Sequence, residues 1–204
     1  MRMHADLDDI PATFIRMPNE LKLMFAEELG TPDVNALATT SREMNKLLVR
    51  FLYQSAKDSR TKRGRPYFLL AVDDGNLMAV ERFVKVGALV NMTDTVTDLP
   101  ETALHSCAYF GHVEIAEFLI DKGETNVSAV DRLGDTPLHS VVTGMYPKEE
   151  MMTLLIEASA DVNANWGSLT ALHKAARTGD VRMVQSLLNL GADMHAADRD
   201  GLRP

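Results

Sequence analysis

Apolar and polar residues follow a paired helical pattern through the second half of the chain. Two segments carry apolar residues at helical spacing, and each follows a shorter segment that contains small residues. The matching apolar residues are Ile115, Leu119 and Ile120 in the first segment and Met183, Leu187 and Leu188 in the second. A glycine, Gly111 or Gly179, separates the short segment from the long one. This pattern predicts two helices joined by a left-handed glycine turn, with a buried apolar stripe on the second helix.

A tetrapeptide begins each of these pairs. It reads Thr-Ala-Leu-His at 102–105, Thr-Pro-Leu-His at 136–139 and Thr-Ala-Leu-His at 170–173, so that successive starts lie 34 residues apart. A constant period of this size indicates stacked supersecondary units rather than one compact domain. We therefore expect a solenoid, which offers a long binding surface instead of a central catalytic cavity.

This pattern resembles the ankyrin repeat, and the resemblance covers residues 66–204. It implies an all-α solenoid of about four repeats plus a truncated fifth, in which the Thr and His of the tetrapeptide tie the first helix to the adjoining turn. The predicted repeats are 66–92, 102–129, 136–164 and 170–196, with a partial unit at 203–204. The first repeat is diverged, and Ser159 replaces the closing glycine of the third, which also carries about two extra residues near Gly144. Because the array stops within a repeat, we expect a fragment whose last helix leaves Met183, Leu187 and Leu188 uncovered.

The segment before the repeats is a separate module. Apolar residues after Pro18, Thr31 and Ser41 predict three short helices within residues 16–57, after a flexible tail at 1–15 and before a basic linker at 58–65. This segment resembles the F-box, which attaches substrate receptors to the Skp-family adaptor of cullin–RING ubiquitin ligases. The matching residues are Pro18, Glu20, Leu21, Met24, Leu29, Val34, Leu37, Ala38, Ser41 and Arg42. Met17 stands where the family has Leu, and the third helix lacks the family's Trp.

Composition and charge narrow the classes of partner. The net charge is −8, but residues 1–65 hold 11 Lys/Arg and 9 Asp/Glu whereas residues 66–204 hold 10 and 20. Acidic repeats argue against nucleic acid and favour a basic or apolar protein surface. The single cysteine, Cys107, is expected to be a buried spacer. The chain has no apolar run of about 18 residues and no apolar signal segment, so we expect a cytoplasmic or nuclear protein without a membrane partner.

No motif in the sequence predicts catalysis. His105, His139 and His173 occupy one position in successive repeats rather than forming an i, i+4 metal pair, and no phosphate loop or nucleophile elbow is found. We therefore expect no enzyme activity, cofactor or metal.

Three hypotheses for function remain open at the level of sequence. The first is a protein-interaction adaptor that serves as a substrate receptor of an SCF-type ubiquitin ligase. The second is an ankyrin scaffold whose N-terminal helices only cap the array, and the third is a regulatory fragment of a larger enzyme or channel. By ankyrin analogy, the partner contacts the first helices and the tips of the turns. The expected protein-binding residues are Ser106, Tyr109, Phe110, Ser140, Thr143, Trp166, Lys174 and Arg177, and the expected adaptor contacts are Pro18, Leu21 and Met24.

Overall fold

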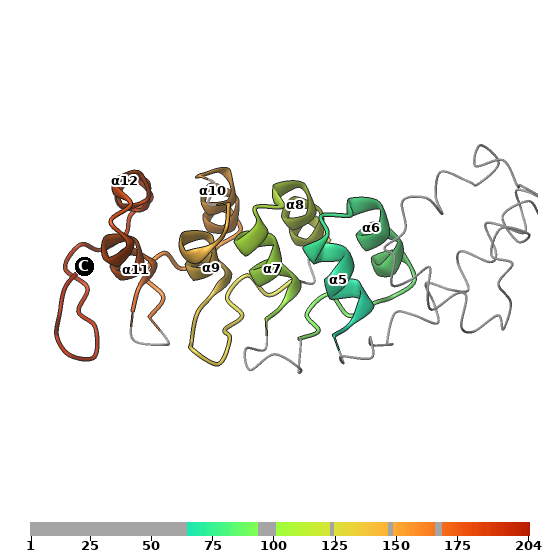
Figure 1. Ribbon diagram of the computed structural model, residues 1–204, viewed down its shortest axis with the longest axis horizontal. Helices are drawn as coiled ribbons and strands as arrows, with labels where there is room; N and C mark the ends of the chain where they lie inside the picture. Colours follow the sequence, from blue (N-terminus) through green and yellow to red (C-terminus); the bar gives the residue numbers. More distant parts are fainter. Residues whose placement is uncertain (1–64, 94–100, 123–124, 147–148, 166–168) are drawn as a thin grey trace, which may run out of the picture. The chain divides into compact units, whose positions relative to one another are not determined.

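The computed structural model describes residues 65–93, 101–122, 125–146, 149–165 and 169–204. The regular elements of these residues are eight α-helices arranged in consecutive pairs (Figure 1). They are α5 (Tyr67–Asp73), α6 (Leu77–Lys85), α7 (Ala103–Phe110), α8 (Val113–Asp121), α9 (Pro137–Thr143), α10 (Glu149–Glu157), α11 (Ala171–Thr178) and α12 (Val181–Asn189). The expected all-α class is confirmed for this part of the chain. The predicted tail at 1–15, the F-box-like module at 16–57 and all but the last residue of the linker lie outside the described residues.

The chain divides into two compact units, 1–89 and 90–204, and helices α5 and α6 belong to the first. Phe68 of α5 and Phe83 of α6 are fully buried and meet edge to face, with ring centroids 6.1 Å apart. Arg65 precedes α5, and its guanidinium lies 2.7 Å from the carboxylate of Asp73, the last residue of that helix. Residues 66–92, predicted as a diverged repeat, therefore do contain a helix pair with its own apolar core.

In the second unit, the helices lie in two rows. The first helices of the repeats, α7, α9 and α11, form one row, and α8, α10 and α12 form the other (Figure 1). Within the first row, α7 packs against α9 and α9 against α11. Cys107 and Ala108 are fully buried in α7, where their small side chains allow close approach of the neighbouring helix. The prediction that Cys107 is a buried spacer is confirmed.

Left-handed residues end the helices where glycines were expected. Gly111 and Gly179 follow α7 and α11 with φ of 71° and 74°, and Gly191 follows α12 with φ of 93°. Ser159, which stands where the other repeats have a closing glycine, adopts the same conformation with φ of 72°. In this conformation the Cβ of an L-residue lies too close to the following carbonyl oxygen, which strains the backbone. The turn after α10 therefore keeps the left-handed conformation although serine is less suited to it than glycine.

The connection between α9 and α10 departs from the other repeats. Gly144 approaches α7 so closely that a Cβ on it would lie 2.6 Å from the Tyr109 carbonyl oxygen and 2.8 Å from that of Ser140. The next residue, Met145, donates its backbone N–H to the same Tyr109 oxygen at 2.9 Å. The extra residues of the third repeat are therefore held against the second repeat by backbone contacts that only glycine permits.

The expectation that the last helix leaves its apolar stripe uncovered is wrong for two of its three residues. Met183 is 5% exposed and Leu187 is fully buried, because their spacing places them on the side of α12 that packs against α11. Leu188 is partly exposed. Leu202, which follows in the terminal segment, is 64% exposed and does not cover the stripe.

Candidate functional site

Threonine and histidine form a reciprocal cap at the start of each first helix in the second unit. The backbone N–H of Thr102 donates to Nδ1 of His105 at 3.2 Å, and the Thr102 hydroxyl lies 2.9 Å from the same nitrogen. Thr136 with His139 and Thr170 with His173 repeat this arrangement at 3.1 and 3.2 Å. Each pair satisfies backbone donors that a helix start otherwise leaves unpaired.

The second ring nitrogen of each histidine reaches the turn that leads into the next repeat. Nε2 of His105 lies 3.0 Å from the Asp135 carbonyl oxygen, Nε2 of His139 lies 2.9 Å from that of Leu169, and Nε2 of His173 lies 3.2 Å from that of Leu202. The implied role of the tetrapeptide, to tie the helix to the adjoining turn, is confirmed. Because both ring nitrogens are engaged, these side chains are poorly placed to act as metal ligands or bases. Among the residues that the structure describes, no group of three His, Cys, Asp or Glu could hold a metal ion.

The hydrogen bonds require a neutral imidazole. Since Nδ1 accepts a backbone N–H, the ring proton lies on Nε2, which donates to the carbonyl. Burial is the largest cause that lowers the pKa of His105 below its usual value, and it lowers the pKa of His139 in the same way. The carbonyl bonds and nearby Asp131 and Asp135 act in the opposite direction but do not overcome burial.

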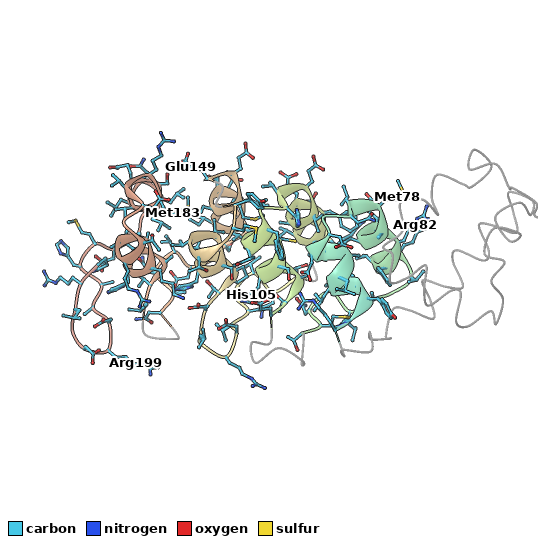
Figure 2. All side chains as sticks on the ribbon, in the orientation of Figure 1. Met78, Arg82, His105, Glu149, Met183 and Arg199 are labelled. Atoms are coloured by element: carbon cyan, nitrogen blue, oxygen red, sulfur yellow. The ribbon has the colours of Figure 1, made fainter. Side chains whose placement is uncertain are left out.

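Two turns accept these histidine bonds through the same local structure. Asp131 uses its carboxylate to accept the N–H groups of Leu133 and Asp135 at 2.8 and 2.9 Å. Asp198 does the same for Asp200 and Leu202 at 2.9 and 2.8 Å. Each turn places its last carbonyl in front of a histidine, and Figure 2 shows Arg199 at the outer end of the second turn. Residues 198–204 thus contribute a backbone acceptor rather than an apolar cover.

Asp135 also joins two repeats through its side chain. Its carboxylate forms an ion pair with the ammonium group of Lys174 on α11, and both side chains are more than four-fifths buried. Lys174, predicted to contact a partner, is therefore already engaged within the chain. Its charge is largely compensated before any partner approaches.

The predicted binding residues fall into distinct classes of exposure. Tyr109, Thr143 and Arg177 occupy equivalent positions on α7, α9 and α11 and are exposed. Phe110 and Ser140 are partly exposed. Ser106 is only 2% exposed, because α9 packs on that side of α7, so its side chain does not lie on the predicted surface. Trp166 lies outside the described residues.

Charge differs sharply between the first row and two helices of the second row, α8 and α10, whereas α12 contains Arg182 and no carboxylate. The row of α7, α9 and α11 contains no carboxylate, and its only Lys/Arg residues are Lys174 and Arg177. By contrast, α8 and α10 contain six carboxylates and no Lys or Arg. All six are exposed, and Figure 2 shows one of them, Glu149, on the second row. They are Glu114, Glu117, Asp121, Glu149, Glu150 and Glu157.

Two exposed apolar residues were missed by the sequence analysis. Met145 and Tyr146, directly after Gly144, are each 58% exposed. The signal that pointed to them was the extra length of the third repeat, which marked an insertion but gave no direction for its side chains. The backbone N–H of Met145 donates to the carbonyl oxygen of Tyr109, whose side chain is itself 39% exposed.

In the part of the chain that the structure describes, no helix is both long and apolar enough to span a membrane.

Comparison with known proteins identifies the repeats. A family description for ankyrin repeats in three copies matches residues 36–131, 68–165 and 124–198. The first match begins at residue 36, inside the segment predicted to be F-box-like. The matched family is the ankyrin repeat, and the F-box-like module at 16–57 stays a prediction.

Similar sequences occur in proteins of different sizes. A putative ankyrin repeat protein of fowlpox virus, FPV223, is 28% identical over 103 residues, which cover 50% of this chain and 70% of that protein. Notch homolog protein 1 of Xenopus laevis is 32% identical over 132 residues, or 63% of this chain and 5% of that protein. Human B-cell lymphoma 3 protein is 33% identical over 135 residues, which cover 63% of this chain and 29% of that protein. The chain thus spans only a small part of the last two. Because the family matches together run from residue 36 to residue 198 and the Thr–His cap recurs in three consecutive repeats, this chain belongs to the ankyrin repeat family.

Proposed function

We propose that this chain is a protein-interaction module whose partner lies along α7, α9 and α11 and the turns that precede them. Ankyrin repeats are protein-binding units, and nothing in the matched family points to catalysis. The observation that supports this surface is that α7, α9 and α11 carry no carboxylate, whereas α8 and α10 of the other row carry six. A row without carboxylates can bury apolar side chains of a partner without desolvating negative charge.

Exposed residue types on the first row also support the proposal. Tyr109 and Arg177 belong to the types that most often dominate the energy of an interface. Thr143 lies between them in the series of equivalent positions and adds a small polar side chain.

The charge arrangement changes the class of partner that we favour. The sum over residues 66–204 suggested a basic or apolar partner, but the carboxylates of α8 and α10 lie in the other row. For the first row we therefore favour an apolar partner surface that carries little positive charge.

Quantitative affinity capture tests the location of the surface. The full chain, a Tyr109→Ala/Arg177→Ala variant and a matched Glu117→Ala/Arg182→Ala variant would be compared against the same cell extract. Glu117 and Arg182 are exposed on α8 and α12, so the control removes the same number of surface groups from the second row. We expect captured proteins to be lost with the first variant and kept with the second. Loss with the second variant alone would refute the proposed surface.

Recruitment of a ubiquitin ligase is a second proposal that rests only on the sequence of residues 16–57. Binding of purified Skp-family adaptor to the full chain, abolished by Leu21→Ala/Met24→Ala, would support it. An absence of binding would favour the simpler scaffold, in which these residues cap the array. Recovery of a longer reading frame with a catalytic or channel domain would support the third hypothesis. Placement in the cytoplasm or nucleus is likewise a proposal, which microscopy of the tagged chain can test.

A further inference from the structure

We infer that the partner of this surface is an extended peptide segment with an apolar or aromatic side chain and, about six residues away, a carboxylate. The apolar side chain would bind the patch formed by Tyr109, Phe110, Met145 and Tyr146, hereafter the apolar patch, and the carboxylate would pair with Arg177. The inference rests on the proposed function and adds the chemistry of the partner.

The apolar patch joins two repeats. Tyr109 and Phe110 end α7, whereas Met145 and Tyr146 follow α9 in the next repeat. The bond from Met145 N–H to the Tyr109 carbonyl and the close approach of Gly144 hold the two segments together. The insertion is therefore positioned by backbone contacts and not by burial of its own side chains, which stay exposed.

The aromatic side chains of α7 are already ordered against one another. The rings of Tyr109 and Phe110 meet edge to face with centroids 5.1 Å apart, and Phe110 stacks on His112 at 5.9 Å. Rings held in place lose less conformational freedom when a ligand binds. Exposed apolar groups gathered in this way mark an interaction site more often than isolated surface hydrophobes do.

Charge on the same row selects the rest of the ligand. Lys174 is paired with Asp135, but Arg177 is exposed and makes no ion pair among the described residues. The absence of carboxylates from α7, α9 and α11 disfavours a lysine or arginine in the ligand and leaves Arg177 as a site for an acidic group.

Spacing between these features sets the length of the segment. Tyr109 and Arg177 hold equivalent positions two repeats apart, and neighbouring helices pack about 8–10 Å from axis to axis. The two contacts are then roughly 20 Å apart, which an extended chain spans in about six residues at roughly 3.3 Å per residue.

Selection from a random peptide library tests the inference, with the purified full chain as the target. We expect enriched peptides to contain an aromatic or aliphatic residue about six positions from Asp or Glu and to be depleted in Lys and Arg. A synthetic consensus peptide should lose about tenfold in affinity with Met145→Ala/Tyr146→Ala.

Reversal of the charge at Arg177 is the more specific test. Arg177→Glu should weaken the acidic peptide at least tenfold and restore binding to a peptide with Lys in place of the acid. Arg182→Glu on α12 is the matched control, and unchanged helical circular dichroism would show that each variant folds.

The outcomes separate this inference from the proposed function. Peptides that depend on Tyr109 but not on Arg177, or that are rich in Lys and Arg, overturn the partner chemistry and leave the surface intact. Peptides that depend only on residues of α8 and α10 overturn both. Failure to enrich any peptide over the Met145→Ala/Tyr146→Ala variant overturns the inference, as does evidence from sedimentation that a second copy of the chain occupies the patch.

Discussion

At the scale of single residues, the repeats show how one backbone position constrains its amino acid. Gly191 and Ser159 both follow a second helix with positive φ, but only glycine adopts that conformation without steric cost. Gly144 is constrained differently, because its φ is ordinary and the limit is the space beside Tyr109 and Ser140. Glycine is therefore favoured at Gly191 by its backbone conformation and at Gly144 by the space around its α-carbon.

Ser159→Gly should stabilise the chain. Removal of the Cβ relieves the left-handed strain at φ of 72°, which we expect to raise the free energy of unfolding by about 1 kcal/mol. Urea unfolding monitored by circular dichroism measures the change. Ser159→Ala is the control, since it keeps the Cβ and should give no gain. Equal stability of the Gly and Ala variants would contradict the explanation.

At the scale of elements, the Thr–His cap both begins a helix and joins it to the next repeat. One imidazole accepts from its own helix start through Nδ1 and donates to the next turn through Nε2, which only the neutral ring can do. Helix capping and repeat stacking are thus coupled through the same side chain.

This coupling predicts loss of stability at mildly acidic pH. In the unfolded chain His105 and His139 titrate near 6.5, and burial lowers both pKa values in the folded chain. The stability that the two histidines contribute is therefore fully present above pH 6.5. It is lost as the pH drops from 6.5 toward the folded pKa values, because in that range only the unfolded chain takes up the protons. The slope should approach about 1.4 kcal/mol per pH unit for each histidine.

A His105→Gln/His139→Gln variant isolates the effect, because Gln can keep the cap to the threonine N–H but does not titrate. It should be less stable at pH 7.5 and show a flatter decline between pH 6.5 and 5 in thermal unfolding. A decline as steep as that of the natural sequence would show that other groups cause it.

At the scale of the whole molecule, contacts between repeats decide which charges face a partner. Asp135 lies just before the third repeat and Lys174 within the fourth, and their ion pair removes one cation from the surface. Six of the exposed carboxylates lie on α8 and α10. On α7, α9 and α11 the exposed side chains are apolar or uncharged apart from Arg177, although the repeats as a whole are acidic.

The Asp135–Lys174 pair should contribute to stability across repeats. Asp135→Asn and Lys174→Met each leave one largely buried charge unpaired, and each should cost roughly 1–2 kcal/mol. The double variant should cost less than the sum of the two, with a coupling of about 1 kcal/mol. A double-mutant cycle in urea measures this coupling, and strict additivity would show that the pair contributes nothing.

The sequence by itself determined the repeat and the structure inside it. The 34-residue spacing is read directly from the recurring tetrapeptide, and the Thr–His caps and the left-handed Gly111 and Gly179 depend on residues within about ten positions of one another, which a linear pattern records. The apolar stripe of Ile115 and Leu119 was likewise predictable, because helical spacing fixes which residues share a face.

Only the tertiary structure decided what the stacked repeats expose. Ser106 looked like a surface residue until the neighbouring helix buried it, and Lys174 looked free until the stack placed Asp135 beside it, 39 residues away. The same stacking buried Met183 and Leu187 and set Met145 against Tyr109. These outcomes depend on distances between repeats, which the pattern within one repeat does not contain.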